Sequence, residues 1–87
     1  MSSMETVFNA LPVITPDFAA ALAQRASLFA AHVFLQYKNM SLSVDSLIGI
    51  LSLNLRKGMT VTVTAEGDDA QAAVEAVCKM LAEEYIK

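Results

Sequence analysis

Alternating apolar and polar residues predict four short strands along the chain. The clearest is Met59–Ala65, where threonines alternate strictly with apolar or small residues. Two further alternating stretches, His32–Tyr37 and Leu42–Val44, predict a hairpin with Lys38–Asn39 in its turn, since asparagine tolerates a positive φ. A fourth strand is expected at Thr6–Asn9, followed by an unusually apolar loop.

Capping residues followed by apolar residues at helical spacing predict three helices. The first has Thr15 as N-cap, a proline next and Asp17 in the first turn, and is expected to run to about Ala31. The second follows Asp45–Ser46 and ends at Asn54, which can adopt the left-handed conformation. The third is expected to be capped by Gly67-Asp68-Asp69, with Ala70, Ala73, Val74, Val77, Leu81 and Tyr85 forming its apolar stripe.

The resulting order of elements, β-α-β-β-α-β-α, combines amphipathic helices with half-buried strands. It predicts an α+β fold: an open-faced sandwich in which three helices pack on one face of a four-stranded antiparallel sheet. No linker, repeat or low-complexity segment interrupts residues 1–87, so a single domain is expected.

Composition narrows the function classes. Hydrophobic residues make up 55% of the chain and charged residues 17%, which favours a compact core and leaves room for a partner-binding surface. The net charge is −3 and the six basic residues are scattered, which argues against nucleic-acid binding. Polar residues interrupt every apolar run, and the first residues do not resemble a secretory signal. We therefore expect a cytoplasmic protein without a membrane span.

Few residues offer chemistry of their own. The chain has no Cys/His cluster, glycine-rich phosphate loop or nucleophile–base pair, so no metal, cofactor or enzymatic activity is expected. The single cysteine, Cys78, falls beside Val77 on the last helix, and partial burial is expected. The single histidine, His32, falls near the predicted end of the first helix, where a partly protonated imidazole is favourable.

Three segments carry a resemblance to a known family. They are Ser46–Leu53 (SLIGILSL), Lys57–Gly58 and Thr64–Gly67, in the order of elements described above. The chain resembles the HPr phosphocarrier family of the bacterial sugar phosphotransferase system over nearly its whole length. The resemblance implies the open-faced sandwich. It also implies that Ser46 matches the regulatory serine that HPr kinase phosphorylates in Gram-positive members.

The sequence departs from the family at the phosphocarrier site. The family has Gly-Ile-His-Ala-Arg-Pro-Ala at the entry to its first helix, whereas this chain reads VITPDFA over Val13–Ala19. Thr15 stands at the histidine position and Asp17 at the arginine position. A phosphocarrier needs a nucleophilic imidazole, and threonine forms only a phosphate ester. No catalytic residue is therefore expected, and Thr15 is interpreted as an N-cap, with a regulatory phosphosite as the alternative.

The second helix offers the remaining candidate sites. Ser46 is either a plain helix cap or a regulatory phosphorylation site, and Asp45 occupies a position where the family commonly has lysine. Leu47, Ile48 and Leu51 match the family's apolar docking patch, and the alternative is that they belong to the core.

These features favour a regulatory or adaptor protein that acts by protein–protein binding, similar to the family's catabolite-repression paralogue, which also lacks the histidine. The resemblance implies HPr kinase/phosphorylase and a LacI-type catabolite regulator, or phosphotransferase system enzymes, as partners. One alternative is a divergent phosphocarrier component of the sugar phosphotransferase system. A second is a non-catalytic oligomeric structural module.

Overall fold

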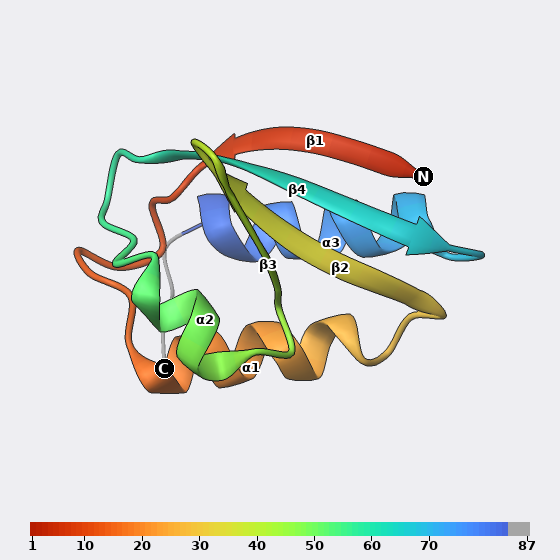
Figure 1. Cartoon of the computed structure of the whole chain (residues 1–87), viewed down its shortest axis with the longest axis horizontal. Helices are drawn as coiled ribbons and strands as arrows, with labels where there is room; N and C mark the ends of the chain where they lie inside the picture. Colours follow the sequence, from red (N-terminus) through yellow and green to blue (C-terminus); the bar gives the residue numbers. More distant parts are fainter. Residues whose placement is uncertain (84–87) are drawn as a thin grey trace.

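Seven elements make up the described part of the chain, residues 1–83 of a computed structural model (Figure 1). They are β1 (Ser2–Val7), α1 (Pro16–Ala26), β2 (Ala31–Tyr37), β3 (Met40–Ser43), α2 (Leu47–Ser52), β4 (Thr60–Gly67) and α3 (Ala70–Ala82). The strands form one antiparallel sheet in the order β1-β4-β2-β3. The predicted open-faced α+β sandwich and its order of elements are confirmed.

Strand β4 lies in the interior of the sheet and has the predicted alternation. Val61, Val63 and Ala65 are buried, whereas Thr62 and Thr64 are half-buried on the opposite face. Antiparallel pairing with β1 on one side and β2 on the other fixes the register, so that Val63 lies opposite both Met4 and Leu35. A shift of one residue would turn the apolar set to the open face.

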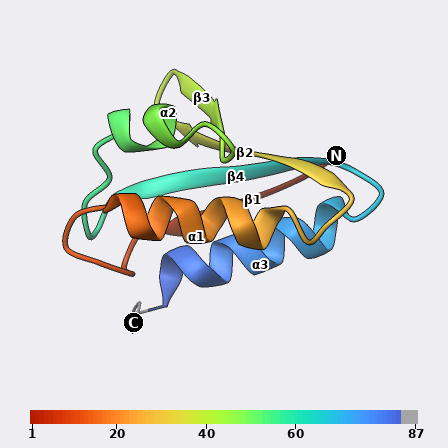
Figure 2. The ribbon, with the colours of Figure 1, turned by 90° about the horizontal axis from the view of Figure 1, so that it is seen from below.

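Helices α1 and α3 lie side by side beneath the sheet, while α2 packs against α1 and the edge strand β3 (Figure 2). The stripe predicted for α3 is buried from Ala70 to Leu81, and Tyr85 lies outside the described residues. The largest fully buried side chains are Phe8, Phe18, Leu22, Leu35, Ile50, Leu55 and Leu81. The rings of Phe8 and Phe18 meet edge to face, 5.7 Å apart, and tie the N-terminal loop to α1.

Several predicted boundaries were wrong. The first strand covers Ser2–Val7 rather than Thr6–Asn9, because β4 offers a pairing edge along its whole length. Helix α1 ends at Ala26, not near Ala31, and Ala31 already pairs with Gly67 in the sheet. The residue with positive φ in the hairpin turn is Lys38 (54°), although asparagine follows it.

The early end of α1 is stabilised by a contact with the loop before α3. The Ala30 amide donates to the Asp69 carboxylate (3.0 Å), and the Asp69 amide donates to the Ala30 carbonyl (3.3 Å). Asp69 therefore stands at the N-cap position without the side-chain capping bond expected of it. Beside this contact, Gly67 has φ of +132°, and a Cβ there would lie 2.5 Å from the Ala30 oxygen.

The apolar loop after β1 is ordered by pairing with the loop after α2. Phe8 exchanges hydrogen bonds with this second loop: its amide donates to Met59 (2.8 Å) and its carbonyl accepts from Gly58 (2.8 Å). Ala10 and Ile14 are buried, with 3% and 7% of their surface exposed. The loop is apolar because it closes one end of the core, and this pairing places the start of α1.

Cys78 is buried, as expected, with 5% of its surface exposed. Its thiol faces β1 and lies 3.8 Å from the Met4 carbonyl oxygen. Burial raises the pKa of the Cys78 thiol, because the thiolate would lose its hydration. The reactive thiolate is therefore disfavoured at this position.

Candidate functional site

The start of α1 is capped as the sequence predicted. Thr15 has an extended backbone (φ −118°), and its Oγ1 accepts a hydrogen bond from the Phe18 amide at 3.2 Å. Pro16 occupies the first turn without leaving an amide unpaired, and Asp17 places a carboxylate beside the positive end of the helix dipole. Thr15, Pro16 and Asp17 are all exposed. The predicted N-cap at Thr15 is therefore confirmed.

A basic loop lies directly beside this helix start. Val13 pairs with Arg56 as an isolated antiparallel bridge, framed by bonds from the Ile14 amide to Leu55 (2.9 Å) and from the Lys57 amide to Pro12 (3.0 Å). Arg56 and Lys57 therefore carry two positive charges next to the entry of α1, and both are exposed.

Ser46 caps α2, as predicted. Its Oγ accepts a hydrogen bond from the Gly49 amide at 3.3 Å, and its backbone carbonyl accepts from Ile50 at 2.9 Å. A Cβ at Gly49 would lie 2.8 Å from this Oγ, so glycine leaves the space in which the serine hydroxyl sits. Ser46 and Asp45 are both exposed. The helix ends at Ser52 with Leu53 as its C-cap, and Asn54 has the left-handed conformation (φ 52°) as expected.

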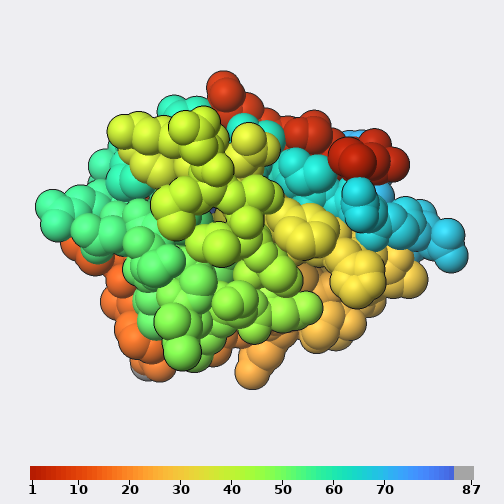
Figure 3. Space-filling model, viewed as in Figure 1, coloured from red at the N-terminus to blue at the C-terminus, as the bar shows by residue number. Residues whose placement is uncertain are grey.

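The apolar residues of α2 divide between surface and core. Ile48 is 83% exposed and Leu47 40% exposed, whereas Leu51 is half-buried against the core and Ile50 is fully buried. In the space-filling view, α2 forms part of the front surface and adjoins the start of α1 (Figure 3). Val13, 43% exposed, belongs to the neighbouring loop. We call Leu47 and Ile48 the α2 surface.

His32 is not at a helix end, and that prediction was wrong. It lies exposed in β2, opposite Glu66 of β4, because α1 stops at Ala26 and the chain enters the sheet at Ala31. The start of β2 and the start of α1 lie at opposite ends of α1 (Figure 1). Helix α1 has 11 residues. Its length of about 16 Å separates His32 from Thr15.

Sequence reasoning missed two residues of this site. Gly49 leaves the space that the Ser46 hydroxyl occupies as a cap. The sequence could have indicated this role, because a glycine stands three residues after a capping serine, in a helix where alanine would otherwise be preferred. Arg56 is placed beside Val13 by pairing of two loops. No periodicity in the sequence connects these loops.

The fold and the site define the class of protein. It is a small open-faced α+β sandwich, and its candidate functional surface combines the start of the first helix with the short second helix. The model of the family described as "PTS HPr component phosphorylation site" matches residues 17–83. The chain therefore belongs to the HPr family. The matched residues begin at Asp17, so Thr15 lies just outside them.

Relatives and solved structures agree with this assignment. The HPr-like protein Crh of Halalkalibacterium halodurans is 32% identical over 66 residues, which cover 76% of this chain and 79% of that protein. The phosphocarrier protein HPr of Bacillus anthracis superposes with a TM-score of 0.85 at 28% identity, covering 92% of this chain and 95% of that one. Crh of Bacillus subtilis, described as a domain-swapped dimer, superposes with a TM-score of 0.77 at 31% identity, covering 85% of each chain.

Among residues 1–83, no group of histidine, cysteine and acidic side chains has an arrangement that could hold a metal ion. Within the same part of the chain, no helix is long and apolar enough to cross a membrane.

Proposed function

We propose that this chain is a regulatory or adaptor member of the HPr family, which acts in the cytoplasm by binding other proteins and not as a phosphocarrier or an enzyme. The observation that carries the proposal is the start of α1. A threonine caps the helix there. The only histidine of the sequence lies in β2, beyond the opposite end of the helix.

The chemistry at Thr15 opposes reversible phosphoryl transfer. An imidazole can accept and release a phosphoryl group readily, whereas a threonine phosphate is a stable ester. Asp17 adds a carboxylate in the first turn. At a separation of about 5 Å, this charge would raise the energy of a bound phosphate by roughly 1–3 kcal/mol for effective dielectric constants of about 80 to 20. The same carboxylate stabilises the unliganded helix by about 0.3–1 kcal/mol.

Enzyme I with phosphoenolpyruvate should therefore leave this protein unlabelled under conditions in which a phosphocarrier HPr is labelled fully. Radiolabelled phosphoenolpyruvate, with acid lability to distinguish phosphohistidine from phosphothreonine, measures this directly. The His32→Gln variant is the matched control. Acid-labile label on the wild-type chain that disappears in His32→Gln would contradict the proposal, because it would make His32 a displaced phosphocarrier residue.

The α2 surface supports the binding role. Ile48 exposes 83% of its surface, whereas most other large apolar residues among residues 1–83 are buried or half-buried. Contiguous exposed apolar residues rimmed by polar residues mark protein-binding sites, and Leu47 lies next to Ile48 in the chain. By the relation to Crh and HPr, we infer that HPr kinase/phosphorylase, a LacI-type catabolite regulator or phosphotransferase system enzymes bind here.

Ser46 is the proposed point of control. Its hydroxyl is exposed, it precedes the α2 surface directly, and a phosphate added to it would remain close to the Gly49 amide that the hydroxyl already accepts from. Asp45 opposes the modification, because it places a second negative charge on the adjacent residue. We therefore expect phosphorylation of Ser46 to be slower than that of a family member with lysine at this position.

HPr kinase with ATP should label the wild-type chain on Ser46, and Ile48→Glu should lower the initial rate about tenfold. The change removes an apolar contact and adds a charge to the docking surface, while an exposed substitution alters stability by only about 0.5 kcal/mol. Met40→Glu, an equally polar change of a residue that is 45% exposed and outside α2, should label at the wild-type rate. Peptide mapping and a melting curve check both variants, and label on Thr15 instead of Ser46 would contradict this proposal.

A further inference from the structure

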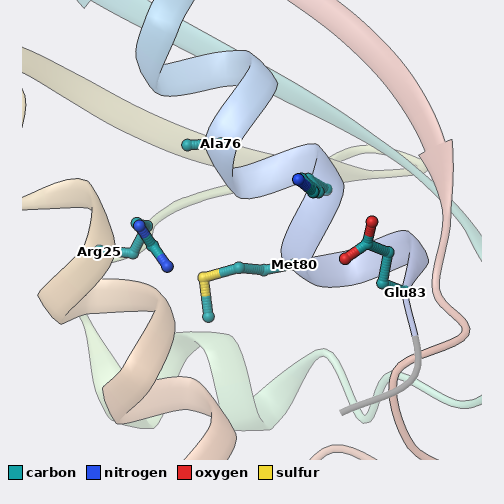
Figure 4. A pocket seen from close by; sticks show the side chains of 5 residues that line it. Arg25, Ala76, Met80 and Glu83 are labelled. Carbon is teal, nitrogen blue, oxygen red and sulfur yellow. The ribbon is translucent and has the colours of Figure 1, made fainter.

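A groove runs between α1 and α3, away from the α2 surface. It consists of two adjoining depressions of about 360 and 510 Å³, which share Arg25 and Met80. Lys79 and Glu83 line the first, and Leu28 lines the second. In the close view, Met80 extends from α3 into the space between the helices, towards Arg25 on α1 (Figure 4). We call this feature the α1–α3 groove.

The charges of the groove favour an acidic ligand. Arg25 and Lys79 approach it from two different helices, so that two of the six basic residues of an acidic chain line one groove. Glu83 lies at its edge, and Glu75 lies one turn from Lys79 on α3. Arg25 and Lys79 are both exposed, so a partner can reach both cations.

The apolar residues of the groove suit a helical ligand. Leu28 is 73% exposed and Met80 is half-buried between the helices. Ala21 on α1 and Ala76 on α3 have small side chains, which allow the backbone of a ligand helix to approach the groove closely. Helices α1 and α3 contain 11 and 13 residues. The walls are therefore about 16–20 Å long, which equals three to four helical turns.

We propose that the α1–α3 groove binds an acidic amphipathic helix of a partner protein. One apolar side chain of the helix packs on Met80 and Leu28, where a flexible thioether adapts to the shape of its ligand. A carboxylate one turn away forms a charge-assisted, bidentate pair with Arg25, and Lys79 adds a second cation.

Other occupants fit the charges less well. A second copy related by a two-fold axis would gather the Arg25 and Lys79 side chains of both copies in one interface, where Glu83 of each copy is the one carboxylate among the lining residues. An anionic membrane requires a larger basic cluster than two residues on a chain of net charge −3. That net charge opposes an acidic partner only weakly, because most of the acidic residues lie outside the groove and salt screens charges beyond about 8 Å at physiological ionic strength.

The test is a titration of the ¹⁵N-labelled full chain with a synthetic helical peptide of about 14 residues, which is about 21 Å long. The peptide contains Leu, Ala and Glu, with leucines on one face, and a second peptide carries lysine in place of each glutamate. We expect the acidic peptide to shift amides of α1 and α3 and not of α2. Arg25→Glu should weaken binding at least tenfold. Lys38→Glu, the same change of charge on the hairpin turn, should leave the affinity unchanged.

Leu28→Ser should weaken binding about fivefold while the melting temperature stays within a few degrees of wild type, which separates loss of contact from loss of fold. Arg25→Gln and Lys79→Glu repeat the test if Arg25→Glu does not fold. The proposal is overturned if the acidic peptide does not bind, if both peptides bind equally, or if the shifts fall on α2. A molecular mass that rises to that of a dimer as the protein concentration increases would also overturn it, if Leu28→Ser abolishes the dimer. The occupant of the groove would then be a second copy.

Discussion

Gly67→Ala should lower the free energy of unfolding by about 3 kcal/mol and the melting temperature by roughly 10–20 °C. Two causes act together. The backbone at Gly67 has φ of +132°, which residues with a Cβ rarely adopt. The added Cβ would also lie 2.5 Å from the Ala30 carbonyl oxygen and 2.8 Å from the Ala31 Cα, both of which are backbone atoms and cannot rotate away. The Ala30–Asp69 contact would have to open.

Gly58→Ala is the matched control for this result. Gly58 also has a positive φ (98°), but a Cβ there would have no neighbour within 4 Å. Only conformational strain remains, and we expect a loss of about 1 kcal/mol. Urea unfolding followed by circular dichroism compares the two variants. Equal losses would show that backbone conformation alone matters, and that the close approach of the two loops does not contribute.

Rebuilding the phosphocarrier site should give the largest change in activity. Thr15→His alone should gain little labelling by enzyme I, whereas Thr15→His with Asp17→Arg should be labelled at least tenfold faster. The single change restores a nucleophile but keeps a carboxylate in the first turn, and it removes a helix cap worth about 0.5–2 kcal/mol. The second change replaces that carboxylate with a guanidinium, which can hold the phosphate through two hydrogen bonds.

The initial rate of labelling checks this prediction, and Asp17→Arg without the histidine is the control. It should remain unlabelled, because it supplies a phosphate-binding cation but no imidazole. Adjacent charged groups couple by about 0.5–3 kcal/mol, so the double variant should exceed the sum of the single effects. If Thr15→His alone is labelled as fast as the double variant, then Asp17 is not an obstacle to phosphoryl transfer in this protein.

Local physical chemistry made several parts of this molecule predictable. The caps at Thr15 and Ser46 and the left-handed Asn54 each depend on a residue and its nearest neighbours in sequence, and all three were predicted. The alternation in β4 identified its buried face, because a strand presents every second residue to the core. The order of elements and the resemblance in residues 46–67 then led to the fold and the family.

The end of α1 could not be predicted in the same way. The residues after Ala26 are mostly apolar or alanine and continue to satisfy a helical pattern. The helix stops because the chain beyond it pairs with β4 and because Asp69, distant in sequence, binds the Ala30 amide. The wrong environment assigned to His32 followed from the same error. Long-range pairing outweighed a local preference that is small for each residue.

The sequence by itself determined which helix ends are capped, which strand face is buried, and that a threonine stands at the start of the first helix. The tertiary structure decided which apolar residues of α2 reach the surface, since Ile50 is buried in the core and Leu51 packs partly against it, whereas Ile48 remains exposed. It also brought Arg25 and Lys79 into one groove. Both outcomes depend on how helices pack across the sheet, and that packing joins residues too far apart in the chain for any local pattern to connect them.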